Sequence, residues 1–163
     1  MNTKQRLEVM KEIETANKRH VEKWKAQQQE PETMRAVYVD VYGSGKAKVI
    51  RIKRNLQEYY RLLHCNTVDM PFRWVDGKQF VFICDDEGLF RSDCRPSARR
   101  GSEVMLVGNL LIVAFDGKED IRGLTRKEAQ HIMKNVLRVV RLGLHGAEIW
   151  DTINNVTYQP ENR

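Results

Sequence analysis

Four arginines stand within ten residues of the chain and offer its clearest binding chemistry. They are Arg91, Arg95, Arg99 and Arg100, with Ser92 and Ser97 between them. A guanidinium is planar and donates two parallel hydrogen bonds to a phosphate, and serine hydroxyls add further donors. The segment therefore predicts a loop that binds a nucleotide or a nucleic-acid backbone. A solvated loop without a ligand is the alternative.

A second group of basic residues lies between residues 46 and 54. Lys48 and Arg51 from this group join the four arginines as candidate residues for binding nucleic acid or phosphate. Tyr38 and Tyr42 on the preceding segment are candidates for stacking on bases. Lys48 and Arg51 are three residues apart, so in a strand they point to opposite faces, which weakens the case for a single basic patch.

Two glycine-containing segments resemble ligand-binding loops but lack the spacing that such loops need. Gly43-Ser44-Gly45-Lys46 does not have the GxxxxGK[ST] pattern of a phosphate-binding loop and precedes an expected strand, where that loop must open a helix. Asp85-Asp86-Glu87-Gly88 offers carboxylates for a hard cation, but no EF-hand spacing follows. Both segments are interpreted as turns.

His64, Cys65, Cys84 and Cys94 carry the imidazole and thiolate chemistry of a zinc site, but none of the cysteines forms a CxxC pair. Cys84 lies in an apolar run, where cysteine is usually a small hydrophobe. Residues adjacent in sequence, such as His64 and Cys65, rarely point at each other, and no nucleophile, base and orienting group can be named together. We therefore assign no catalytic residue, metal or cofactor, and we expect binding rather than catalysis.

Composition limits the class of protein. With 163 residues and 41% apolar content, the chain can bury one ordinary core. The net charge of +6 permits nucleic-acid binding without demanding it. The longest apolar run, Val104–Phe115, is too short to cross a membrane, the first residues lack a secretory pattern, and three unpaired cysteines suit a reducing compartment. We expect a cytoplasmic protein of the host cell without membrane association.

The first thirty residues contain no glycine or proline before Pro31, and they predict one helix from about residue 3 to residue 29. Its narrow apolar stripe includes Leu7, Met10 and Trp24, which are the candidate partner-binding residues. Two arrangements remain open. The stripe packs on the rest of the chain, or it pairs with a second copy as a short coiled coil.

The remaining sequence predicts strands and two helices. Strands are expected at 35–42, 48–52, 68–75, 79–84 and 104–115, and capped helices are expected to start after Asn55 and Thr125. The second of these helices is expected to continue to Val140. The predicted organisation is a helical arm over residues 1–33, a compact domain over 34–142, and a tail over 143–163 with a short helix around residues 147–154. The fold class is α+β, a mainly antiparallel sheet with helices on one side.

Several of these segments are similar to a known family. They are residues 35–41, the helix from Leu56 to Asn66, residues 80–89, Arg95-Pro96-Ser97 and residues 106–113. Over residues 34–125 the chain resembles the uncharacterised family called domain of unknown function 3846. The resemblance implies a small protein of phages, plasmids and other mobile elements, and it assigns no catalytic residue.

Three functions follow as hypotheses. The first is a non-catalytic accessory protein of a mobile element that binds nucleic acid through a basic loop. The second is a protein-interaction module that inhibits a host defence or regulatory protein, and the third is a protein that sequesters a nucleotide.

Overall fold

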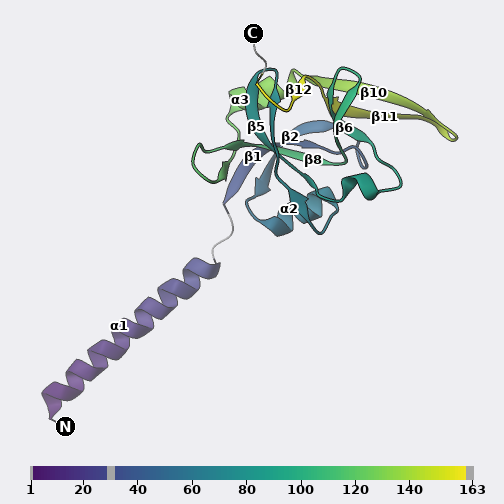
Figure 1. The fold of residues 1–163 in the computed structure, drawn as a ribbon. Helices are drawn as coiled ribbons and strands as arrows, with labels where there is room; N and C mark the ends of the chain where they lie inside the picture. The colour runs from purple at the N-terminus through teal and green to yellow at the C-terminus, as the bar shows by residue number, and fades with distance from the viewer. Residues whose placement is uncertain (1, 29–31, 161–163) are drawn as a thin grey trace. The chain divides into compact units, whose positions relative to one another are not determined.

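The computed structural model describes residues 2–28 and 32–160, and the chain divides into two compact units, Met1–Pro31 and Glu32–Arg163 (Figure 1). The first unit is a single helix, α1 (Thr3–Gln28). The Asn2 side chain accepts a hydrogen bond from the Gln5 backbone N–H, and the Gln5 side chain accepts one from the Asn2 N–H. The predicted helix is confirmed, but its predicted end at residues 29–31 lies outside the described residues. No described helix is long and apolar enough to cross a membrane.

The second unit is built on an eight-stranded sheet, in which the strands follow the order β12-β4-β5-β8-β1-β2. Two further short strands, β3 and β9, pair with β5 and β8. The strands are β1 (Thr33–Val39), β2 (Ala47–Lys53), β3 (Val68–Asp69), β4 (Phe72–Val75), β5 (Lys78–Asp85), β8 (Leu110–Phe115), β9 (Ile121–Arg122) and β12 (Val156–Thr157). All their pairings are antiparallel, and the predicted hairpin of β1 and β2 is confirmed.

Helices cover both faces of this sheet. α2 (Leu56–Leu63) packs with the buried cluster that contains Tyr38 and Ile83, and α3 (Arg126–Met133) packs with the cluster that contains Val37 and Phe82 (Figure 1). Neighbouring residues of β1 and β5 thus point to opposite faces, and both faces are buried. The predicted α+β class is confirmed. The expectation of helices on one side, and of one buried face on β1, is corrected.

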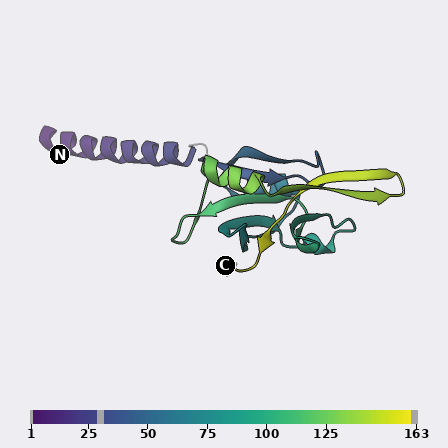
Figure 2. The same cartoon turned by 90° about the horizontal axis from the view of Figure 1, so that it is seen from above.

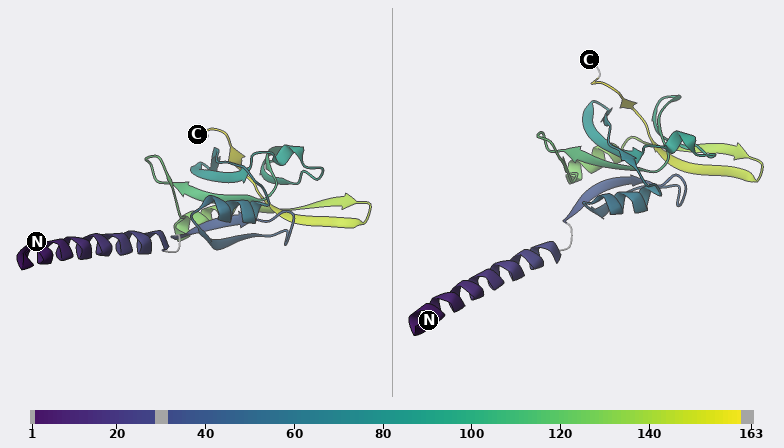
Figure 3. Two further views of the ribbon diagram at one scale, coloured as in Figure 1. Left: turned by 90° about the horizontal axis from the view of Figure 1, so that it is seen from below. Right: turned by 60° about the horizontal axis from the view of Figure 1, so that its bottom comes forward.

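A second, four-stranded sheet has the order β10-β11-β6-β7. Its strands are β6 (Pro96–Arg100), β7 (Glu103–Val107), β10 (Val136–Gly143) and β11 (Gly146–Ile153), and a short 3-10 helix, η1 (Gly88–Phe90), precedes them. Strand β11 meets β6 in parallel at Ile153 and Ala98. The β10–β11 hairpin projects from the unit, and β12 then returns to the first sheet beside β4 (Figures 2 and 3).

Two predicted helical segments are wrong. The helix that begins after Thr125 ends at Met133, and Val136–Gly143 forms strand β10 instead. The tail helix expected around residues 147–154 is strand β11, which pairs with β10 along its whole length. In both segments cross-strand pairing stabilises the extended chain, although the apolar spacing also fits a helix.

The predicted helix starts are confirmed. The Asn55 side chain accepts a hydrogen bond from the Glu58 N–H, and Thr125 with Glu128 forms a complete capping box. Glu58 does not complete a box with Asn55, because its carboxylate accepts a hydrogen bond from the Lys53 N–H. That bond fixes the end of β2 against the start of α2.

Candidate functional site

Arg91 is engaged by neighbours within its own chain. Its Nε lies 3.4 Å from the Asp85 carboxylate, and it also donates a hydrogen bond to the His64 carbonyl. Its guanidinium lies 5.1 Å from the centre of the Tyr42 ring, a cation–π distance. These contacts fix the loop before β6 against the end of α2.

The Arg95 side chain is largely enclosed, with 19% of it exposed. It donates to the Val41 carbonyl at 2.9 Å and pairs with Asp93 at 3.0 Å and Glu148 at 3.4 Å. Arg141 pairs with the same two acids. Because two carboxylates neutralise two guanidiniums here, this cluster is less suited to an external anion than the sequence predicts.

Arg99 and Arg100 belong to strand β6, which the sequence analysis assigned to a loop. The Nε of Arg99 is buried and has no hydrogen-bond partner among the described residues. Arg100 is exposed and lines a shallow pocket with Tyr158 and Pro160. The four candidate arginines therefore divide into two pairs. Arg91 and Arg95 contact acids of their own chain, whereas Arg99 and Arg100 lie on a strand, and the four do not form one loop site.

Lys48 and Arg51 lie on opposite faces of β2, as their spacing predicts. Ile50 and Ile52, on the Lys48 face, pack with the α2 cluster. Arg51 shares the other face with Val49, which lines a groove between β2 and α3. Only Arg51 of this pair is beside α3.

The groove between β2 and α3 has a volume of about 400 Å³ and a basic lining. Its residues are Arg35, Val49, Arg126, Ala129, Gln130 and Met133. None of them is acidic. Arg126 is exposed, and the Arg35 side chain donates a hydrogen bond to the Leu124 carbonyl at 2.9 Å, which holds its guanidinium at the base of α3. The groove thus combines one fixed cation, Arg35, and one exposed cation, Arg126, with an apolar floor.

Strand pairing places a third cation beside a residue of this groove. Arg51 is directly opposite Arg35 in the β1–β2 register, and Lys53 follows Arg51 on the same face. Neither Arg51 nor Arg126 makes an ion pair with another described residue. Like charges directly opposite each other destabilise a sheet pair. An anion placed between the Arg35 and Arg51 guanidiniums would therefore relieve their repulsion. The sequence analysis missed Arg35 and Arg126, because only the tertiary fold brings α3 beside β2.

The two candidate stacking tyrosines serve the fold. Tyr38 is buried, and its hydroxyl donates to the Leu62 carbonyl at 2.8 Å. Burial, together with the Asp40 carboxylate, raises the pKa of Tyr38 to about 12, so this hydroxyl stays a donor. Tyr42 donates to the Asp93 carbonyl and carries two guanidiniums beside its ring. Because its ring is buried, Tyr38 is not available for stacking on bases, and that expectation is wrong.

The cysteines do not converge on a metal site. Among the described residues, no group of three or more histidine, cysteine, aspartate or glutamate side chains is placed to hold an ion. Burial raises the pKa of Cys84 to about 12, with a further contribution from Asp69. Since the thiolate is the nucleophilic form, Cys84 is poorly suited to covalent catalysis.

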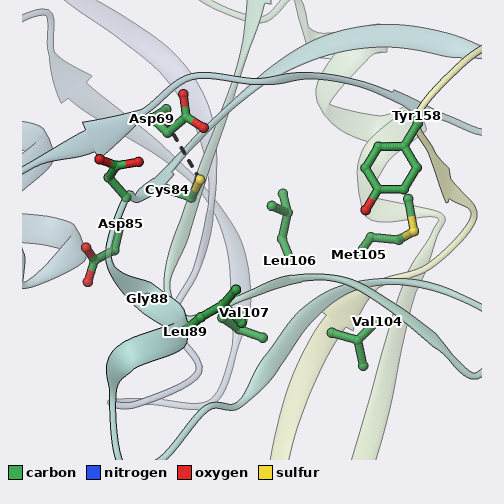
Figure 4. Close-up of a pocket in the computed structure, with 11 residues that line it drawn as sticks. Asp69, Cys84, Asp85, Gly88, Leu89, Val104, Met105, Leu106, Val107 and Tyr158 are labelled. Carbon is green, nitrogen blue, oxygen red and sulfur yellow. Dashed lines mark hydrogen bonds between the residues drawn. The ribbon is translucent and has the colours of Figure 1, made fainter.

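A second depression lies between β7 and the ends of β3 and β5 (Figure 4). It has a volume of about 340 Å³. Asp69, Cys84 and Asp85 stand at one end, whereas Tyr158 and Met105 stand at the other (Figure 4). This pocket has the opposite electrostatic character to the β2–α3 groove, because its lining contains three aspartates and no lysine or arginine.

The candidate partner-binding residues of α1 are exposed. Leu7, Met10 and Trp24 are 55%, 61% and 57% accessible. Large apolar side chains in such a row are unusual on a surface that meets only water.

Comparison with known proteins gives one match. The family model described as Domain of unknown function (DUF3846) matches residues 34–137. No curated protein and no solved structure matches the chain. The matched segment runs from β1 through α3, and it therefore contains both walls of the basic groove and both walls of the acidic pocket except Tyr158. Because the match covers well over half of the chain, the protein belongs to the family Domain of unknown function (DUF3846).

Proposed function

We propose that this protein binds the phosphate backbone of nucleic acid in the groove between β2 and α3. The observation that carries the proposal is a groove lined by Arg35 and Arg126 and by no carboxylate, with Arg51 directly opposite Arg35 on the neighbouring strand. Guanidiniums bind phosphates through paired hydrogen bonds, and Arg35, which the Leu124 carbonyl holds in place, loses little side-chain entropy on binding. We propose it as a non-catalytic accessory function of a phage or other mobile element, in the cytoplasm of its host.

The apolar floor of the groove suits a sugar-phosphate chain better than free phosphate. Val49 and Met133 line the groove together with the cations and offer a surface to the sugars. No aromatic side chain lines the groove, so base stacking does not contribute. Recognition is therefore expected to be electrostatic and insensitive to sequence.

The double substitution Arg51→Ala and Arg126→Ala is expected to weaken binding to a short DNA or RNA duplex about tenfold or more. Each lost phosphate contact should also lower the slope of log affinity against log salt by about 0.9. Fluorescence anisotropy between about 50 mM and about 200 mM salt measures both quantities. Both side chains are exposed, so the fold should remain intact.

The matched control is Lys78→Ala with Lys118→Ala, which removes two exposed charges elsewhere on the unit. Equal losses in the two double variants would show that net charge alone drives binding, and the groove assignment would fail. If the intact protein bound neither DNA nor RNA at the lower salt concentration, the proposed function itself would be wrong.

A second candidate function rests on α1. We also propose that this helix pairs in parallel with α1 of a second copy. Met10, Asn17 and Trp24 are spaced by seven residues, and Ile13 and His20 occupy the intervening heptad position. A single asparagine in such a seam fixes register and favours dimers, at a cost in stability.

Sedimentation equilibrium of the full chain is expected to show a monomer at low micromolar concentration and a dimer as the concentration approaches millimolar. Met10→Glu with Ile13→Glu should abolish this dependence, because two charges would enter the seam. Glu8→Gln with Glu12→Gln, outside the seam, is the control. A monomer at all concentrations would exclude self-association and favour a different protein as the partner of Leu7, Met10 and Trp24.

A further inference from the structure

Strand β7 has an outer edge that no other described strand covers. It ends the second sheet and pairs only with β6 on its inner side. Basic side chains protect sheet edges against pairing with other chains, and the edge strand β2 carries Lys48, Arg51 and Lys53. Strand β7 has a single charged residue, Glu103, at its start. The edge of β7 is therefore free of strand pairing among the described residues, and Gly88 of η1 lies beside it at Val107.

The acidic pocket runs along this open edge. Four consecutive residues, Val104–Val107, line it. Side chains of a strand alternate between two faces, so a pocket that meets four successive residues follows the strand's edge and not one of its faces. Asp69 on β3 and Cys84 and Asp85 at the end of β5 stand at one end of this space, and Tyr158 stands at the other (Figure 4). We call this space the slot.

The aspartate end of the slot favours a cation, whereas the Arg73 guanidinium lies over the Tyr158 ring at the other end. Asp69 and Asp86 are exposed, and neither makes an ion pair with another described residue, whereas Asp85 is held by Arg91. The rest of the lining is largely apolar and includes Leu89 and Leu106. A ligand that fits both ends has a basic group followed by uncharged or apolar groups.

We propose that the slot binds an extended, basic peptide segment of a partner protein, which adds to β7 as a further strand. Its main-chain N–H and C=O groups pair with the free edge of β7, as in other cases of β-strand addition. A lysine or arginine side chain meets Asp69 and Asp86, and an apolar side chain packs on Leu106. This site is separate from the β2–α3 groove, and the inference does not depend on nucleic-acid binding.

The probe is a labelled, acetylated seven-residue peptide that begins with lysine and continues with alternating valine and threonine. Titration into the ¹⁵N-labelled full chain is expected to shift the amide signals of Val104–Val107 and to leave those of β2 and α3 in place. Substituting glutamate for the peptide's lysine should weaken binding about fivefold or more, because attraction becomes repulsion. Asp69→Lys with Asp86→Lys should do the same to the original peptide.

Methylation of alternate peptide nitrogens tests the strand pairing itself, because it removes hydrogen-bond donors and leaves the side chains unchanged. This change should abolish binding. Binding that survives methylation would overturn the added strand, and so would shifts confined to residues outside β7. No binding at millimolar peptide would overturn the proposal as a whole, while the anisotropy measurements on the groove would be unaffected.

Discussion

Replacing Asn109 with alanine is expected to lower the free energy of unfolding by about 3 kcal/mol. Asn109 is 2% exposed and stands between β7 and β8. Its amide oxygen accepts a hydrogen bond from the Tyr42 N–H, and its amide nitrogen lies 3.2 to 3.3 Å from the Tyr38 hydroxyl, the Asp40 carboxylate and the Leu62 carbonyl. Alanine leaves these buried groups without that partner and creates a cavity.

Urea denaturation followed by circular dichroism measures this change. If the slope of the unfolding free energy against urea concentration is unaltered, the substitution affects the native state alone. Asn66→Ala, at an exposed position, is the control and should change stability by less than about 0.5 kcal/mol. A loss below about 1 kcal/mol for Asn109→Ala would mean that water replaces the amide and that this residue does not organise the ends of β1, α2 and β8.

Asp151→Ala is expected to lower the free energy of unfolding by about 3 kcal/mol, because it removes a connection between the two sheets. The Asp151 side chain is nearly buried; one of its oxygens accepts the Ala47 N–H at 2.9 Å, and the other pairs with Arg138 at 3.1 Å. Its backbone N–H also donates to the Gly45 carbonyl at 2.7 Å. These bonds attach β11 of the second sheet to the start of β2. Without the carboxylate, a buried N–H loses its acceptor.

Two further variants separate the parts of this effect. Asp151→Asn retains an acceptor for the Ala47 N–H and should lose about 1 kcal/mol. Arg138→Ala removes only a half-exposed partner and should lose less than about 1 kcal/mol. Thermal and urea denaturation of the three variants measure the order of their losses in unfolding free energy. Equal losses for Asp151→Asn and Asp151→Ala would assign the effect to the charge and contradict the role of the Ala47 bond.

The strands near the N-terminal side of the second unit could be predicted because local signals agree there. Alternating valines mark β1, Asp76-Gly77 marks the turn between β4 and β5, and capping residues mark both helix starts. The hairpin of β10 and β11 could not be predicted in this way. Its apolar residues also fit a helical period. The extended conformation depends on the pairing of β10 with β11 and on the bridge between Ile153 and the distant Ala98.

The residues of the candidate binding site were harder to predict from the sequence than the fold. Arg51 and its separation from Lys48 could be identified from the sequence. The leading candidates there were Arg91 and Arg95, which pair in the structure with Asp85, Asp93 and Glu148. A run of arginines does not reveal where the compensating acids are. Asp85 and Asp93 are near Arg91 and Arg95 in sequence, whereas Glu148 lies on β11, which the sequence predicts as a helix.

The return of β12 to the first sheet affects how the protein folds during its synthesis. Strand β12 pairs with β4, so Val75 receives its partner Val156 only after about eighty further residues have been translated. Strand β6 likewise waits for Ile153 of β11. At typical translation rates of about 5 to 20 residues per second, both edges stay uncovered for several seconds on the ribosome. A nascent chain stalled before β11 would expose these edges to chaperones and to other nascent chains.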